Sequence, residues 1–276
     1  MNLNNWTGER LETFVNTEVA VEHLHRYAIV LGLAKGKRVL DIASGEGYGS
    51  NLIAGVADEV VGVDISEDAI YRAQSKYKKG NLRFLEGSAS SIPLSDNYFD
   101  VVVSFETIEH HDKHHEMMSE IKRVLKPEGL LIISSPDKLH YTDKRQFFNK
   151  FHVKELYAQE FKDLVRKNFT NSNFYNQRAT FASLLIPDEE NYAFKEYRGN
   201  YDRITEINEF EQLYILAVAA DVPLPDIQLS AFTDDELMYR ITTATIDKVR
   251  KTLSYRIGHY ILWPLKAGKK AIAYFK

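Results

Sequence analysis

Short apolar runs alternate with amphipathic stretches along the chain from residue 18 to residue 177. EVVGVDI (59–65) and FDVVVSF (99–105) are apolar at consecutive positions, which is typical of strands buried on both faces of a parallel sheet. We predict strands at residues 38–42, 59–65, 81–87, 99–105, 129–135 and 171–177.

The stretches between these runs carry the spacing and the boundary residues of helices. Ser66 suits an N-cap, and Pro127 stops the helix that precedes it. We predict helices at residues 18–33, from 48, from 66, at 115–125 and at 152–168. The alternation predicts an α/β fold, a Rossmann-like doubly wound sheet that is mostly parallel and has helices on both faces.

The pattern weakens between residues 178 and 211, which are rich in Tyr, Asn, Asp and Glu. This segment is an excursion from the sheet and a candidate acceptor-site region, because loops at the edge of a sheet carry specificity. QLYILAVAA (212–220) restores the strand pattern. We therefore predict an N-terminal helical cap (1–36), a core (37–220), and a linker with a basic helical C-terminal extension (221–276).

Composition narrows the class of protein. Hydrophobic residues make up 44% and charged residues 27%, ordinary values for a globular protein with a full core. The absence of cysteine excludes disulfides, thiolate nucleophiles and Cys-ligated metals. The first residues lack the apolar region of a secretory signal, so we expect a cytoplasmic protein.

The charge is distributed unevenly. After Asp247 there are eight Lys or Arg residues and no acidic residue, so the rest of this −4 chain carries −12. An acidic body argues against DNA and disfavours RNA as a partner. The tail has three interpretations: it lies on an anionic membrane surface at the inner face, packs against a partner such as a glycosyltransferase or another subunit, or docks on the body.

A glycine turn follows the first strand in VLDIASGEGYG (39–49). Gly45 and Gly47 lie in a G-x-G-x-G spacing, Asp41 lies in the strand before them, and Asp64 ends the next strand. A carboxylate at Asp64 suits a ribose diol, and one at Asp41 suits a cationic amino-acid cofactor better than a pyrophosphate. These features favour S-adenosylmethionine (SAM) over NAD; a turn without a ligand is the remaining alternative.

The motifs VLDIASGEGYG, VVGVDIS, LEGSASSIPL, FDVVVSFETIEH and EIKRVLKPEGLLIISSP resemble those of class I SAM-dependent methyltransferases. The resemblance implies a seven-stranded sheet whose last strand is antiparallel. It implies that the methionine part of SAM is held by Asp41, Ala43, Gly45 and Gly47. It assigns the ribose to Asp64, the adenine to Ile65, Ser88 and Ala89, and the neighbourhood of the methyl-bearing sulfur to Phe105.

An E-x-x-E-H sequence follows the fourth strand. If a helical turn begins there, Glu106, Glu109 and His110 fall on one face and form a mixed oxygen and nitrogen site for Mg²⁺ or Mn²⁺, and less readily for Zn²⁺. The motif resembles two metal-dependent groups, the small-RNA 2′-O-methyltransferases and the catechol O-methyltransferases of ubiquinone synthesis. In the RNA group a further histidine completes the site, and order along the chain makes His152 its counterpart.

A metal-free interpretation of the same residues stays open. Many class I enzymes use such residues to cap the turn, or use the histidine as a base. We therefore take His110, His111 and Glu106 as candidate catalytic residues. In the segment before the first strand, Arg26 is our candidate partner for the carboxylate of SAM.

We predict a SAM-dependent O-methyltransferase, assisted by a divalent metal, that methylates a sugar hydroxyl of a glycan or glycolipid precursor. The N-terminal segment and the tail resemble those of glycan-assembly methyltransferases. The alternatives are a catechol-type or RNA 2′-hydroxyl acceptor, or a non-catalytic SAM-binding scaffold of a glycan-assembly complex.

Overall fold

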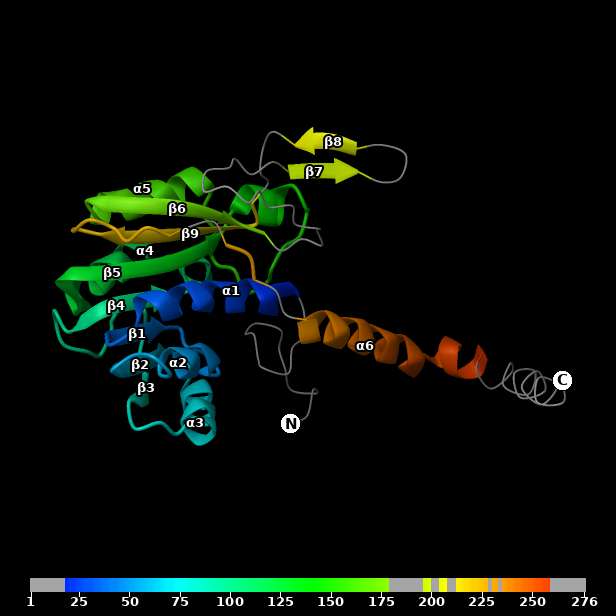
Figure 1. Ribbon diagram of the computed structural model, residues 1–276, viewed down its shortest axis with the longest axis horizontal. Coiled ribbons are helices and arrows are strands. Elements are labelled where there is room, and N and C mark those ends of the chain that lie inside the picture. Colours follow the sequence, from blue (N-terminus) through cyan, green and yellow to red (C-terminus); the bar gives the residue numbers. More distant parts are fainter. Residues whose placement is uncertain are drawn as a thin grey trace, which may run out of the picture.

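The computed structural model describes residues 18–178, 196–199, 204–207, 212–227, 230–232 and 235–258. At its centre is a seven-stranded sheet with the order β3-β2-β1-β4-β5-β9-β6 (Figure 1). β9 is antiparallel to both of its neighbours, and the other pairs are parallel. The strands are β1 (Arg38–Ile42), β2 (Glu59–Asp64), β3 (Leu82–Glu86), β4 (Phe99–Ser104), β5 (Leu125–Pro136), β6 (Asn171–Gln177) and β9 (Tyr214–Ala220).

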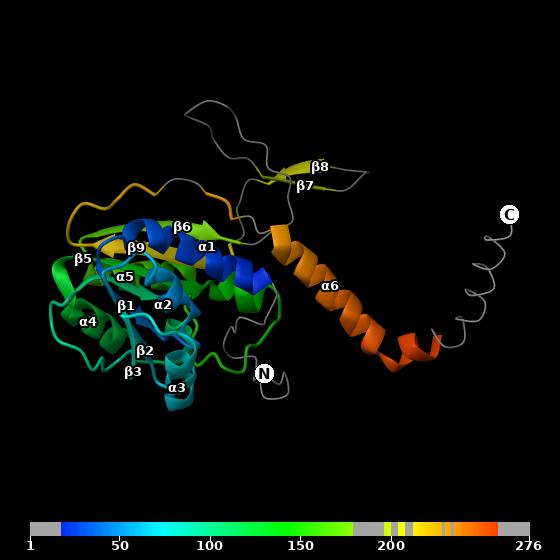
Figure 2. The same ribbon diagram turned by 60° about the horizontal axis from the view of Figure 1, so that its bottom comes forward.

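Helices cover both faces of the sheet, as the alternating pattern predicts. Side chains of α4 (His114–Val124) and α5 (Ala158–Asn168) join the larger core cluster on one face. Side chains of α1 (Glu18–Leu33) and α2 (Tyr48–Ile53) join a second cluster, and α3 (Glu67–Lys76) packs on β2 and β3 (Figures 1 and 2). The predicted α/β Rossmann-like fold with an antiparallel last strand is confirmed.

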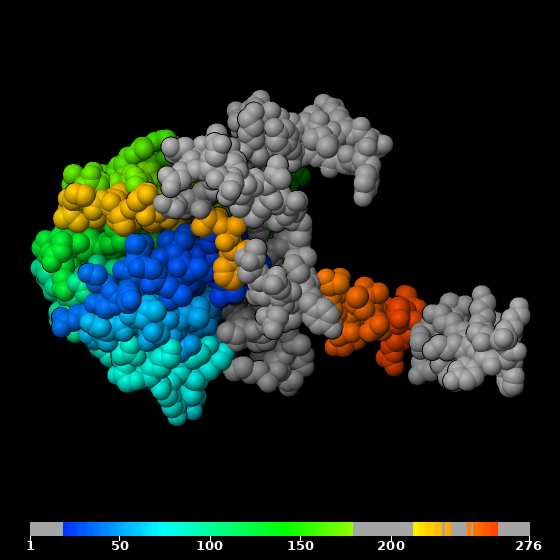
Figure 3. Space-filling model, viewed as in Figure 1, coloured from blue at the N-terminus to red at the C-terminus, as the bar shows by residue number. Residues whose placement is uncertain are grey.

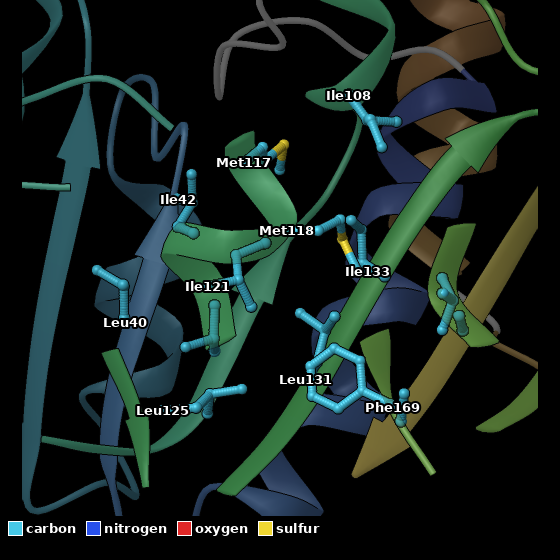
Figure 4. Close-up of a cluster of buried hydrophobic side chains, with 14 of the residues drawn as sticks. Leu40, Ile42, Ile108, Met117, Met118, Ile121, Leu125, Leu131, Ile133 and Phe169 are labelled. Atoms are coloured by element: carbon cyan, nitrogen blue, oxygen red, sulfur yellow. The ribbon is translucent and has the colours of Figure 1, made fainter. Parts of the chain in front are cut away.

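The two core clusters explain why the central strands are apolar at consecutive positions. In β4, for example, Val102 joins this cluster and Val103 joins the second one. Apolar side chains of α4, such as Met118 and Ile121, meet Leu131 of β5 in Figure 4 and are fully buried. A central parallel strand thus needs apolar residues at every position, because both of its faces are covered.

Most predicted boundaries agree with the structure. Ser66 is the N-cap of α3, and its side chain accepts a hydrogen bond from the Ala69 amide. α5 begins at Ala158, whereas the prediction began it at residue 152. The prediction was wrong there because residues 152–157 make other contacts: the Lys138 amide donates to the Leu156 carbonyl, and the amides of residues 153 and 154 bind the Glu109 carbonyl.

Two described segments flank the sheet. Within the predicted excursion, β7 (Glu196–Gly199) and β8 (Ile204–Ile207) form a two-stranded antiparallel sheet that the pattern did not predict; most of the excursion lies outside the described residues. α6 (Asp235–Lys251) extends away from the body (Figures 1 and 3). The tail beyond residue 258 is also outside the described part. No described helix is long and apolar enough to cross a bilayer.

Candidate functional site

The glycine turn after β1 adopts backbone angles that explain its sequence. Ala43, Gly45 and Gly47 all have positive φ values, 58°, 53° and 85°. A Cβ on Gly47 would also lie 2.6 Å from the Phe84 ring. Gly47 is thus required both by its conformation and by its packing against β3.

Asp41 is buried beneath this turn. Its carboxylate accepts hydrogen bonds from Ser50 Oγ (2.6 Å) and from Tyr27 Oη (3.5 Å), and only 1% of the residue is exposed. Burial raises the pKa of Asp41 to about 7, although the hydrogen bonds oppose that shift. A cationic ligand beside this carboxylate would offset the free-energy cost of ionising it. The site therefore suits the ammonium group of SAM.

Asp64 connects the two loops that would enclose the nucleoside. One carboxylate oxygen accepts from the Gly45 amide and the other from the Ser66 amide, each at 2.9 Å. The neighbouring Ile65 is 70% exposed, an unusual position for an isoleucine. The structure therefore places a fixed carboxylate and an apolar surface side by side at the end of β2, as the predicted ribose and adenine contacts require.

The remaining predicted cofactor residues lie in the loops after β3 and β4. Ser88 Oγ lies 3.0 Å from Ser90 Oγ, and Ala89 packs against the edge of the core. Phe105 is buried, with its ring 5.1 Å from that of Tyr27 in an edge-on contact. No contact of the structure tests their roles toward SAM, which stay predictions.

Arg26 is a buried cation on α1, only 1% exposed. Its Nε donates to Gln177 Oε1 at 2.7 Å, and its guanidinium lies 4.5 Å from the centroid of the Tyr214 ring. Nη1 lies 3.1 Å from Glu106 Oε1, yet neither Nη forms a hydrogen bond of good geometry with the described residues. The ion pair with Glu106 thus leaves hydrogen-bonding capacity on both Nη atoms unused, which is costly for a buried group and suits this guanidinium to a carboxylate ligand.

Glu109, His110 and His152 come together beyond the end of β4. One ligand atom from each lies within 4.8 Å of the others. Glu109 is 1% exposed, and its Oε2 has no hydrogen-bond partner among the described residues. Burial, and secondly the charge of Glu106, raises the pKa of Glu109 well above its usual value. A buried carboxylate of this kind fits a bound cation.

The two imidazoles of this group are oriented by neighbouring groups. His110 Nδ1 lies 3.0 Å from the Phe151 carbonyl, and His152 Nδ1 lies 2.5 Å from Glu155 Oε1. Since each Nδ1 then donates its proton to oxygen, each ring carries its lone pair on Nε2, and that of His152 accepts from Asn149 Nδ2 at 2.9 Å. A carboxylate or carbonyl behind the histidine is the usual arrangement at metal sites. Glu155 was not identified from the sequence, although its spacing three residues after His152 was a usable signal.

Glu106 lies outside this group, against the expectation of four converging ligands. Its φ is 50°, in the left-handed region, and the helical turn begins later, as a 3₁₀ helix over Ile108–His110. The assumption of one continuous helical face was therefore wrong for this residue. Glu106 Oε1 accepts from Ser134 Oγ at 2.6 Å and forms the ion pair with Arg26.

His111 is a poorer candidate for a base than its position suggests. Its Nδ1 accepts from the Lys113 amide at 3.1 Å, and its Nε2 lies 3.2 Å from the Met117 sulfur. Burial lowers its pKa. Through the Lys113 amide it stabilises the start of α4, whose N-cap position is Lys113.

Comparison with known proteins agrees with this geometry. Residues 40–133, which include the glycine turn, Asp64 and the E-x-x-E-H sequence, match the sequence profile of the methyltransferase domain family. Residues 40–133 therefore form a class I SAM-dependent methyltransferase domain. The prediction of a SAM-dependent methyltransferase is thus confirmed for the domain, and SAM is its cofactor.

The relatives with known names match only part of this chain. A probable SAM-dependent methyltransferase of Mycolicibacterium smegmatis is 37% identical over 131 residues, 47% of this chain and 50% of that protein. A ubiquinone/menaquinone biosynthesis C-methyltransferase of Stutzerimonas stutzeri is 28% identical over 188 residues, 65% of this chain and 71% of that protein. The chain spans about half the length of the first curated relatives it matches.

The solved structures share the fold of the methyltransferase domain. A putative methyltransferase of Haloferax volcanii, in complex with the Trm112 activator, superimposes with a TM-score of 0.53 at 17% identity. The match covers 75% of this chain and 92% of that one. Identity this low establishes the fold alone. The acceptor and the metal must therefore be argued from the site.

Proposed function

We propose that the protein is a SAM-dependent O-methyltransferase with a divalent cation at Glu109, His110 and His152. Its proposed acceptor is one hydroxyl of a vicinal diol on a sugar of a glycan or glycolipid precursor. The observation that carries the proposal is the buried Glu109 oxygen without a hydrogen-bond partner among the described residues, beside two imidazoles oriented by Phe151 and Glu155.

The cofactor side of the proposal rests on two buried groups of opposite charge near the contacting rings of Tyr27 and Phe105. Asp41 suits the ammonium group of SAM, and Arg26 suits its carboxylate. The Arg26 guanidinium lies 6.0 Å from the centroid of the Phe105 ring. An amino acid held by both charges would extend along this ring, and Asp64 would hold the ribose at the other end of the glycine turn.

The ligand set changes the choice of metal. From the sequence we expected three carboxylate or imidazole ligands beside His152 and preferred Mg²⁺ or Mn²⁺. Without Glu106 the set is one carboxylate and two imidazoles. Imidazole favours Mn²⁺, Fe²⁺ or Zn²⁺ over Mg²⁺, which prefers oxygen ligands and water. We therefore propose Mn²⁺, Fe²⁺ or Zn²⁺.

The reaction itself is an in-line displacement. The acceptor oxygen forms a bond to the methyl carbon, the bond from that carbon to sulfur breaks, and sulfur keeps the electron pair as S-adenosylhomocysteine. A sugar hydroxyl must lose its proton in this step, and a bound divalent cation would supply the acidification of that hydroxyl. The chain holds the donor in place through Arg26, Asp41 and Asp64, and positioning alone lowers the barrier by several kcal/mol.

The similarity to a C-methyltransferase makes transfer to carbon the second candidate. A carbon acceptor has no hydroxyl to acidify at the point of attack, so it would not need a cation beside the methyl group. A catechol or an RNA 2′-hydroxyl, the other two acceptors that the sequence left open, does present a diol to a cation. The acidic body disfavours RNA.

Calorimetry tests the metal site directly. Mn²⁺ or Zn²⁺ titrated into protein saturated with S-adenosylhomocysteine should bind one ion per chain. Glu109→Gln, which keeps the shape of the side chain, and His152→Ala should abolish this binding. His115→Ala is the matched control, because His115 is an exposed histidine of the same region that lies outside the group.

Turnover tests the acceptor. Methyl transfer from labelled SAM should be measured on nucleotide sugars, a catechol, a small RNA and a quinone precursor, with and without EDTA. We expect transfer to a sugar, and its loss in EDTA. Metal binding that survives in both variants, or transfer unaffected by EDTA, would contradict the proposal and return Glu109 and His110 to a structural role. Failure of S-adenosylhomocysteine to bind would instead support the alternative of a non-catalytic scaffold in a glycan-assembly complex.

A further inference from the structure

The described part of the C-terminal extension is a helix that stands away from the body. α6 is followed by a bend at Thr252 and a further helical turn over residues 253–258. It leaves the body at the end where the carboxyl ends of β4 and β5 lie (Figures 1 and 2), and it protrudes in the space-filling view (Figure 3).

One side of this helix is apolar and exposed. Ile246, Val249, Leu253 and Ile257 are 44%, 51%, 72% and 50% exposed. Ile246 and Val249 lie three residues apart on α6, and Leu253 and Ile257 lie four residues apart on the turn after the bend, so each pair shares one side of its helical segment. Proteins rarely leave a line of large apolar side chains in water unless it binds something.

Cations accompany the apolar side. Lys248, Arg250, Lys251 and Arg256 are all exposed, and Asp247 is the last acidic residue of the chain. Arg250 lies 3.6 Å from Asp247, on the exterior. An apolar stripe bordered by Lys and Arg is the composition of helices that lie in the plane of a membrane interface.

We propose that α6 and the turn after it bind an anionic lipid surface, with the apolar stripe inserted and the cations at the head groups. A partner protein would also accept apolar side chains. The charge favours lipid: an uninterrupted excess of cations complements a surface that is negative everywhere, without requiring matched acidic positions. The sequence that follows is of the same kind, with Tyr260, Trp263 and Lys266.

A second basic and apolar surface lies in the loop between β5 and α5. Phe147 and Phe148 are 49% and 83% exposed, and Lys144, Arg145 and Lys150 around them in sequence are exposed as well. This loop follows the carboxyl end of β5, the end of the body from which α6 departs (Figures 1 and 2). Binding through α6 would thus bring the edge of the sheet that carries the candidate site toward the lipid.

Vesicle flotation with the full chain tests this proposal. The probes are phosphatidylcholine vesicles with and without phosphatidylglycerol, at low and high salt. We expect binding to the phosphatidylglycerol vesicles that weakens at high salt. Replacing Lys248, Arg250, Lys251 and Arg256 by Gln should weaken it at least about tenfold, because each cation near an anionic surface contributes roughly fivefold to binding. Replacing the four apolar residues of the stripe by Gln should also weaken it.

The matched control removes the same number of positive charges, four, from the part of the protein outside α6. It replaces Lys35, Lys37, Lys78 and Lys167, all exposed, by Gln. S-adenosylhomocysteine binding, unchanged in all variants, shows that each is folded. No binding at low salt, equal binding to neutral vesicles, binding that survives in both α6 variants, or equal loss in the control would overturn the proposal. In the first case a protein partner becomes the occupant of α6.

Discussion

Asp41→Asn should make the unliganded protein more stable and at the same time weaken its hold on the cofactor. Asp41 is buried, and its pKa is raised from 3.8 to about 7, chiefly by burial. The carboxylate thus costs stability as long as no cationic ligand faces it. Asn has the same shape, and its amide can still bind the hydroxyls of Ser50 and Tyr27.

The size of the effect follows from the pKa. A rise from 3.8 to about 7 is about 3 units, or about 4 kcal/mol at 1.4 kcal/mol per unit. Between these two values the folded state holds the proton while the unfolded state has lost it. The folded state therefore binds more protons in this window, and stability falls as the pH rises through it. The penalty is small at pH values near 4 and complete above pH 7.

Urea unfolding followed by circular dichroism measures this penalty. The gain in unfolding free energy from Asp41→Asn should be larger at about pH 8 than at about pH 4.5, by up to about 3 kcal/mol. Calorimetry should show S-adenosylhomocysteine binding weakened by at least about tenfold, because the ammonium group loses a charged partner.

Asp163→Asn is the matched control, since its side chain is 64% exposed. It should change neither the pH dependence of stability nor cofactor binding. The reasoning would be refuted if Asp41→Asn gave the same change in stability at both pH values, or left the affinity for S-adenosylhomocysteine unchanged.

Three further substitutions test the packing and the cofactor contacts, and each prediction has its own measurement. Gly47→Ala should lower the free energy of unfolding by about 2 kcal/mol or more in urea titrations, because Gly47 has φ 85° and no room for a Cβ. Met118→Ala should cost about 2–5 kcal/mol in the same titration without weakening cofactor binding, since Met118 is fully buried in the core away from the turn. Arg26→Lys should weaken S-adenosylhomocysteine but not 5′-methylthioadenosine, which lacks the carboxylate; equal weakening of both in calorimetry would remove Arg26 from that role.

The fold could be predicted because its signals are local. A strand such as β2, buried on both faces, needs apolar residues at nearly every position, and Ser66 caps α3 through an amide three residues away. The start of α5 could not be predicted in this way. Residues 152–157 are held by contacts to Glu109 and Lys138, which are distant in sequence, and these contacts override the local preference for helix.

The sequence by itself determined the methyltransferase domain, the glycine turn and the types of side chain at the site. Only the tertiary structure decided how those side chains are grouped. Glu106 is turned away to Arg26 and Ser134, whereas His152 lies beside Glu109 and His110, as its order along the chain predicts. The physical reason is that a ligand set depends on side-chain directions and on which charges are buried together, and both are set by contacts between separate elements of the sheet edge.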